Sequence, residues 1–253
     1  MGSAREPLPR GAVVALGRAG ASGTVAKSGN KIMRYMLIGM CVFGAALLQG
    51  CVHGTPPESR WAGDIAKFEA QDETAPPPKG ATLFVGSSTT RRWDLAAYFP
   101  DRVVINRGFG GSQTSDVIEF IHPLVIKHAP KTVVIYEGDN DMNAGKSAWR
   151  VYRDVKRVRS MIHAALPECH VYFLPIKPSL KRWALWPEMN AANQRIRRLT
   201  ERTERFTYVD VATPMLGEDG RPRPELFVED GLHLSDAGYA LWASVLKPAL
   251  DAE

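Results

Sequence analysis

From Ala81 to the C-terminus, short apolar segments alternate with longer amphipathic ones, and this alternation restricts the folds open to the chain. The short segments are rich in β-branched and aromatic residues and bounded by turn residues, which is typical of buried strands. The longer segments carry apolar residues at helical spacing. Strands that alternate with helices predict a parallel sheet covered on both faces. We expect strands at residues 82–85, 103–106, 132–137, 170–174 and 207–210, and helices at 115–128, 147–166, 187–204 and 235–250.

The loops that leave such a sheet should meet at one edge. Right-handed crossovers between parallel strands place every strand-to-helix loop on the same side, where open α/β sheets bind their ligands. Four of the expected loops carry polar or glycine-rich sequences. They are Gly86-Ser87-Ser88, the segment from Asn106 to Ser112, the segment from Gly138 to Asp141, and the segment from Asp230 to His233.

Three residues of these loops suit nucleophilic catalysis. The Ser88 hydroxyl needs a base within hydrogen-bond reach to become a nucleophile, and a neutral His233 imidazole can accept its proton. Asp230 lies three residues before His233, so its carboxylate can orient the ring and stabilise the imidazolium. The alternative is structural: Ser88 would be a helix N-cap, and His233 a capping or packing residue before a helix capped by Ser235.

A tetrahedral intermediate also needs hydrogen-bond donors for its oxyanion. The backbone N–H of Ser88, a backbone N–H of the Gly110-Gly111 turn and the Asn140 amide are suitable donors. Other chemistry fits these loops poorly. The acids around Asn140 lack the alternating spacing of a calcium loop, and Gly108-Phe109-Gly110 has no third glycine for a dinucleotide. We therefore expect no metal and no cofactor.

These four blocks, in this order, resemble the SGNH hydrolase superfamily, also called the GDSL esterase/lipase family, over roughly residues 81–250. The resemblance implies a three-layer α/β/α fold with a flavodoxin-like sheet of about five parallel strands, and ester hydrolysis without a cofactor. It implies Ser88 as nucleophile, Asp230 and His233 as its relay, and Ser88, Gly111 and Asn140 as the oxyanion hole.

One residue departs from the family pattern, because Gly-Asp-Ser is replaced by Gly86-Ser87-Ser88. The missing aspartate orders the nucleophile loop and is not the relay acid. Ser87 can hydrogen-bond locally in its place, so we expect activity to survive.

The substrate is less defined by the sequence. Trp183 and Trp186 lie in a long segment after the fourth strand, and they can stack on a sugar, line an acyl groove or cover the core. Three functions follow. The chain can be a serine esterase acting on small-molecule or lipid esters, a deacetylase of O-acetylated carbohydrates, or a degenerate member that binds glycans or lipids without turnover.

The formal net charge of +5 comes from the first 50 residues, since residues 51–253 hold equal numbers of basic and acidic side chains. The basic balance therefore gives no support for a nucleic-acid partner. Within residues 1–50, Arg34 precedes an uncharged apolar run at 36–48, as in a secretory signal of about residues 33–50. Thirteen or so apolar residues are short for a membrane span.

The end of this run, Leu48 to Cys51, resembles a bacterial lipobox, with Cys51 as the lipidated residue. An uncleaved N-terminal anchor is the alternative. We expect secretion and a lipid anchor facing the periplasm from the outer membrane. Residues 51–79 form a proline-containing tether with a helix near 60–73, and 80–253 form the hydrolase domain. The oligomeric state stays open.

Overall fold

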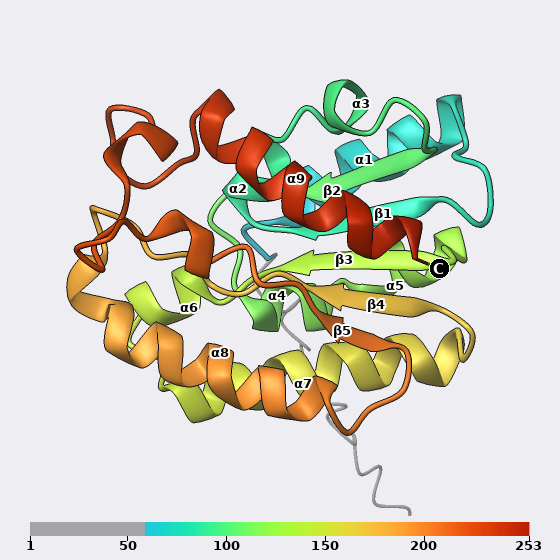
Figure 1. Ribbon diagram of the computed structural model, residues 1–253. Coiled ribbons are helices and arrows are strands. Elements are labelled where there is room, and N and C mark those ends of the chain that lie inside the picture. The colour runs from blue at the N-terminus through green and yellow to red at the C-terminus, as the bar shows by residue number, and fades with distance from the viewer. Residues whose placement is uncertain (1–58, 253) are drawn as a thin grey trace, which may run out of the picture. The chain divides into compact units, whose positions relative to one another are not determined.

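The computed structural model describes residues 59–252, and a parallel sheet in the order β2-β1-β3-β4-β5 forms its centre (Figure 1). This order matches the flavodoxin-like arrangement. Each strand lies within two residues of its predicted range, and the α/β fold class is confirmed. The strands are β1 (Thr82–Gly86), β2 (Val104–Gly108), β3 (Thr132–Tyr136), β4 (His170–Phe173) and β5 (Phe206–Tyr208).

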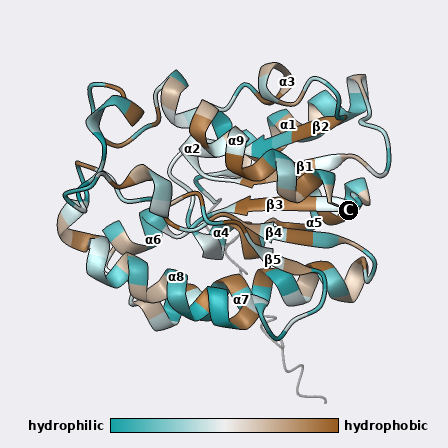
Figure 2. Ribbon diagram, viewed as in Figure 1, coloured by the Kyte–Doolittle hydropathy of each residue, from teal (hydrophilic) through white to brown (hydrophobic). Residues whose placement is uncertain are grey.

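The inner strands β1 and β3 are largely apolar on both faces because helices cover both faces of the sheet (Figure 2). Along β1, Leu83 and Val85 face one apolar cluster and Phe84 faces the other. The first cluster includes side chains of α1 (Ala62–Thr74), α4 (Thr114–Glu119), α5 (Ile121–Leu124), α7 (Ala148–Ala165) and α8 (Trp186–Thr200). The second includes side chains of α3 (Leu95–Tyr98) and α9 (Asp236–Asp251).

Several short elements complete the described chain at the ends of strands. The helices α2 (Ser88–Arg91) and α6 (Asp139–Asn143) follow β1 and β3. Four single 3₁₀ turns are η1 (Ile126–His128), η2 (Trp183–Leu185), η3 (Thr213–Met215) and η4 (Pro224–Leu226). Since α2 and α6 begin where β1 and β3 end, they bring their first residues to one edge of the sheet.

One predicted helix is divided. The expected helix at 115–128 is α4, α5 and η1 in succession. Pro123 explains the break, since it has no N–H to donate to the carbonyl of Glu119 and its ring clashes with that carbonyl. The chain leaves helical geometry at Phe120, with φ −103° and ψ 22°.

The predicted helix near residues 60–73 is present as α1 and packs against the sheet's first cluster. Ile65 is 6% exposed, and Trp61 meets Phe109 edge-on with ring centroids 5.4 Å apart. Asp72 at its other end forms ion pairs with Arg107 of β2 and with Lys127. Apolar contacts and buried charge pairs thus hold α1 within the unit that spans Gly54–Glu253.

Within residues 59–252, no helix has the length and apolar character needed to cross a membrane. The predicted signal and lipidation site at Cys51 lie outside the described residues. Cys169 is buried at the start of β4, as its position before an apolar strand predicts.

Candidate active site

The loop after β1 presents Ser88 at the first position of α2. The N-cap position falls on Ser87, whose carbonyl accepts a hydrogen bond from Arg91 N at 3.0 Å. The Ser87 side chain makes no capping hydrogen bond, so the local bond expected of it is not formed there. Ser88 is half-buried, and its Oγ lies 2.9 Å from Nε2 of His233. Its hydroxyl therefore faces an imidazole instead of capping a helix.

Asp230 completes a chain of hydrogen bonds that begins at Ser88. Its Oδ2 lies 2.5 Å from His233 Nδ1. Its Oδ1 accepts the backbone N–H groups of Leu232 and His233, both at 2.8 Å. Burial would raise the pKa of the Asp230 carboxyl, but these hydrogen bonds outweigh it and hold that pKa well below its ordinary value. The ionised carboxylate favours the His233 tautomer with a proton on Nδ1, which leaves Nε2 as acceptor for Ser88.

The loop after β2 packs closely against α2. A Cβ on Gly108 would lie 2.2 Å from the backbone N of Arg91, so only glycine permits this approach. Gly111 has φ +81° and lies beneath the Trp61 ring. Arg60 donates to the Gly111 carbonyl at 3.1 Å. In residues 59–252 no acceptor takes the Gly111 N–H, which leaves it available as a donor.

Hydrogen bonds on both sides fix the side-chain amide of Asn140. Its Nδ2 donates to the Ser112 carbonyl at 2.9 Å. Its Oδ1 accepts from both terminal nitrogens of Arg182, each at 3.2 Å. These partners determine which amide atom is nitrogen, because a guanidinium can only donate and a carbonyl can only accept. One N–H of Nδ2 remains for a further acceptor.

A buried charge network behind Asn140 was not predicted. Asp139 accepts from Lys177 Nζ at 2.7 Å and from Arg182 Nη1 at 2.6 Å. Lys177 is 1% exposed and also donates to the Tyr136 hydroxyl at 3.0 Å. Burial alone would raise the pKa of Asp139, but the two cations lower it below its ordinary value. Two cations and one carboxylate leave a net positive charge beside the Asn140 amide.

Two further acids lie behind the same loops. Asp141 Oδ2 accepts from the Thr114 N–H at 2.9 Å, and Lys146 lies 2.7 Å from its other oxygen. Glu137 is fully buried, and Ser112 Oγ donates to it at 2.6 Å. Burial, and then the charge of Asp141, raise the pKa of Glu137 well above its ordinary value. The folded protein therefore favours the protonated form of Glu137 more than an exposed position would.

The buried Glu137 predicts a pH-dependent stability. Because its native pKa is raised, the native state holds a proton that the unfolded state releases above the ordinary value of 4.5. The free energy of unfolding should fall as pH rises from there toward the raised pKa. Glu137→Gln cannot release this proton, so its melting temperature should rise relative to that of wild type as the pH increases above the ordinary value of 4.5. Exposed Glu119→Gln is the control, and parallel pH curves for Glu137→Gln and wild type would contradict the assignment.

The predicted substrate tryptophans lie together, with ring centroids 6.1 Å apart and planes at 14°. Trp186 packs against the first apolar cluster, in agreement with the alternative that it covers the core. Trp183 is half-buried, with the Arg221 guanidinium 5.0 Å from its ring centroid. Among residues 59–252, no three His, Cys, Asp or Glu side chains gather as a metal site.

Comparisons with known proteins agree with this fold. The family model described as the GDSL-like lipase/acylhydrolase family matches residues 79–241. A GDSL-like lipase from Bacteroides thetaiotaomicron is 19% identical, with a TM-score of 0.67 over 75% of this chain and 98% of the other. A variant of an acetyl xylan esterase from Geobacillus stearothermophilus is 18% identical, with a TM-score of 0.55 over 68% and 94%. No curated protein matched the sequence.

Proposed function

Since the chain belongs to the GDSL-like lipase/acylhydrolase family, we propose that it is a serine esterase whose Ser88 forms an acyl-enzyme. The observation that carries the proposal is the continuous contact from Ser88 Oγ through His233 to Asp230, with distances of 2.9 and 2.5 Å. Ser88 comes from the segment after β1, and His233 and Asp230 come from the loop before α9. Ser88 and His233 are 145 positions apart in sequence. Packing alone gives no reason for a serine, an imidazole and a carboxylate to align in this order.

The proposed reaction has two halves. His233 Nε2 takes the Ser88 proton as Oγ attacks the ester carbonyl, and the imidazolium then gives that proton to the departing alcohol. Water, deprotonated by the same nitrogen, then attacks the acyl carbon. The bond from that carbon to Ser88 Oγ breaks, the imidazolium returns its proton to Oγ, and the acid is released. The backbone N–H groups of Ser88 and Gly111 and one N–H of Asn140 donate to the oxyanion in both halves.

A panel of p-nitrophenyl esters of increasing acyl length tests this function. Turnover that is saturable and highest on acetate would favour deacetylation of an O-acetylated carbohydrate, the reaction named for the Geobacillus relative. A preference for longer chains would favour lipid esters. Rates equal to those of a Ser88→Ala variant on every ester would contradict the esterase and favour a binding protein.

Asn140→Ala should lower kcat by roughly 10²–10³-fold with little change in KM. The reason is that an oxyanion donor stabilises the transition state more than the bound ester. Its melting temperature should change little, because Asn140 is only partly buried. Steady-state kinetics and thermal unfolding on one purified variant check both expectations. A large drop in melting temperature with normal kcat would instead make Asn140 a structural turn residue.

Arg182 provides a second test of the same amide. As a positioning residue, it holds Asn140 Oδ1 and so directs Nδ2 toward the reacting oxygen. Arg182→Gln should reduce kcat less than Asn140→Ala, and the double variant should be no slower than Asn140→Ala alone. Effects that multiply in the double variant would show that Arg182 acts independently of Asn140.

We also propose that Cys51 carries a lipid. The support is the lipobox-like segment from Leu48 to Cys51 after an apolar run. Expressed in a bacterium, Cys51→Ser should shift the chain from the membrane fraction to the soluble periplasmic fraction, detected by immunoblotting. A mature wild-type chain that begins upstream of Cys51 would exclude processing at this site.

A further inference from the structure

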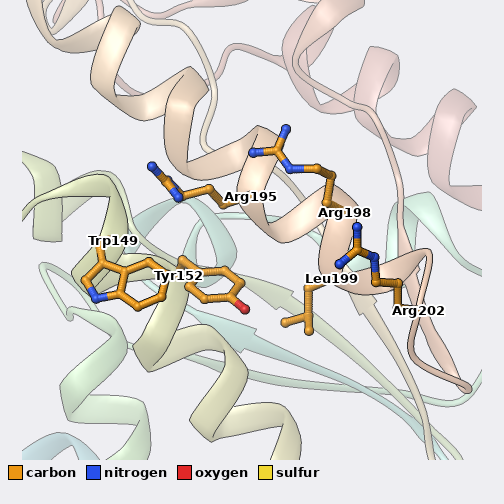
Figure 3. A pocket seen from close by; sticks show the side chains of 6 residues that line it. All are labelled: Trp149, Tyr152, Arg195, Arg198, Leu199 and Arg202. Atoms are coloured by element: carbon orange, nitrogen blue, oxygen red, sulfur yellow. The ribbon is translucent and has the colours of Figure 1, made fainter.

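A basic aromatic surface lies on the outer side of α7 and α8, and the proposed esterase chemistry makes no use of it. Trp149 and Tyr152 of α7 stack with ring centroids 5.1 Å apart. Trp149 is 54% exposed, so this indole faces solvent although burial would stabilise it. Figure 3 shows the two rings beside three arginines, two at the end of α8 and one in the turn that follows it. The Arg195 guanidinium lies 5.8 Å from the Trp149 ring centroid.

Two grooves flank this aromatic pair, and both are basic. A groove of about 180 Å³ is lined, besides the two rings, by Leu199 and three arginines, Arg195, Arg198 and Arg202. A groove of about 410 Å³ on the other side is lined, besides the rings, by Ser160 and three cations, Arg153, Lys156 and Arg157. Neither groove has an acidic lining residue. We call these six cations with Trp149 and Tyr152 the α7–α8 basic surface.

The helical spacing of these cations concentrates their charge. Arg195 and Arg198 lie three residues apart near the end of α8, and Arg202 follows in the turn after it, so the three cations line one groove. Like charges at this spacing repel and destabilise a helix. Elsewhere on α7, Arg150 is paired with Asp154 at 2.8 Å. The six cations have no such carboxylate partner among the described residues, so an anionic partner would relieve their repulsion.

We propose that the α7–α8 basic surface binds anionic phospholipid membranes. The six exposed cations can lie over lipid phosphates, and each basic residue near an anionic surface strengthens binding. The exposed Trp149 fits the headgroup region, where indole rings are favoured because one part is apolar and the other can hydrogen-bond. A soluble polyanion without rings that stack on an indole would be attracted by the cations alone and would gain little from Trp149. The aromatic ridge between the basic grooves thus favours a membrane as the partner.

Vesicle co-sedimentation with the full chain tests the proposal. Wild type should bind vesicles of phosphatidylcholine and phosphatidylglycerol more tightly than phosphatidylcholine vesicles, and salt should weaken the difference. The triple variant Arg195→Gln, Arg198→Gln, Arg202→Gln should lose about 100-fold in partitioning to the anionic vesicles. The matched control removes three exposed lysines outside the surface, Lys67→Gln, Lys131→Gln and Lys247→Gln. Because all variants keep the same N-terminal apolar run, differences between them report the folded surface.

Trp149 separates a membrane from a soluble polyanion. Phospholipids brominated in the acyl chains near the headgroup should quench wild-type tryptophan fluorescence, and Trp149→Phe should lose most of that quenching. Trp149→Ala should also weaken vesicle binding that persists at high salt. If the triple variant and its lysine control lost binding to anionic vesicles equally, the proposal would be overturned. So would binding to dextran sulfate as tight as to anionic vesicles, with no quenching that depends on Trp149.

Discussion

Ser88→Ala is expected to lower kcat for any accepted ester by on the order of 10⁵–10⁶-fold. The substitution removes a single non-hydrogen atom, Oγ, whose hydrogen-bond partner in the structure is Nε2 of His233. Without Oγ no acyl-enzyme can form, and His233 and Asp230 have nothing to activate but water. Residual turnover would then come from the oxyanion donors and substrate binding alone. Single-turnover assays at enzyme excess would measure the small remaining rate.

Labelling and a neighbouring variant make this expectation specific. An organophosphonate should modify wild type on the peptide that contains Ser88 and leave Ser88→Ala unmodified. Ser87→Ala is the matched control, since Ser87 is adjacent and buried but its side chain makes no capping bond. It should keep kcat within about tenfold of wild type. A label on Ser87, or comparable losses in both variants, would refute Ser88 as the nucleophile.

The sheet could be predicted from the sequence because its strands are short apolar runs that end in turn residues. A strand that is buried on both faces carries apolar residues at nearly every position. The sequences of β1 and β3 therefore show little alternation between apolar and polar residues. The break at Pro123 follows from local chemistry and could have been predicted, although periodicity alone extended the helix across it. The short helices α2 and α6 are too brief for a helical period to be visible in their sequences.

The candidate site was predictable where its residues lie in the loops next to strand ends. Ser88 and Asn140 lie in the first turns after β1 and β3, and His233 lies in the loop before α9. Arg182 could not be found this way, since it lies 42 residues from Asn140 in a long irregular segment without a distinctive pattern. Its role depends on where that segment folds back, which tertiary packing decides. Glu137 was missed for a related reason, because only burial in the folded protein raises the pKa of this glutamate at a strand end.

The distribution of charge over the surface also depends on tertiary packing and could not be predicted from the sequence. Equal numbers of acids and bases over residues 51–253 describe the average charge and contain no information about its distribution. The fold brings α7 and α8 side by side, and their outer rows of cations then meet around Trp149. A chain that is neutral on average over this range therefore has a strongly basic face, which is evident only once α7 and α8, separated in sequence by β4, are neighbours.

Asp230→Asn is expected to lower kcat by about 10³–10⁴-fold while the fold is kept. The asparagine Oδ1 can still accept the N–H groups of Leu232 and His233, so the loop should hold its shape. Its Nδ2 would then face Nδ1 of His233, and two donors cannot share a hydrogen bond. The ring is driven to the tautomer with a proton on Nε2, which can no longer accept the Ser88 proton. The partial exposure of Asp230 lets water compensate in part, which is why the expected loss is below that of Ser88→Ala.

The pH dependence of the variant distinguishes a tautomer effect from a damaged loop. The pKa of Asp230 is held well below its ordinary value, so in wild type it stays ionised while the acid side of the rate profile is measured. In Asp230→Asn that acid limb should shift to lower pH, because the protonated form of the relay loses its anionic partner. The melting temperature near pH 7 should stay close to that of wild type. An unshifted acid limb, or a variant that unfolds before its activity can be measured, would show that Asp230 serves the loop rather than the relay.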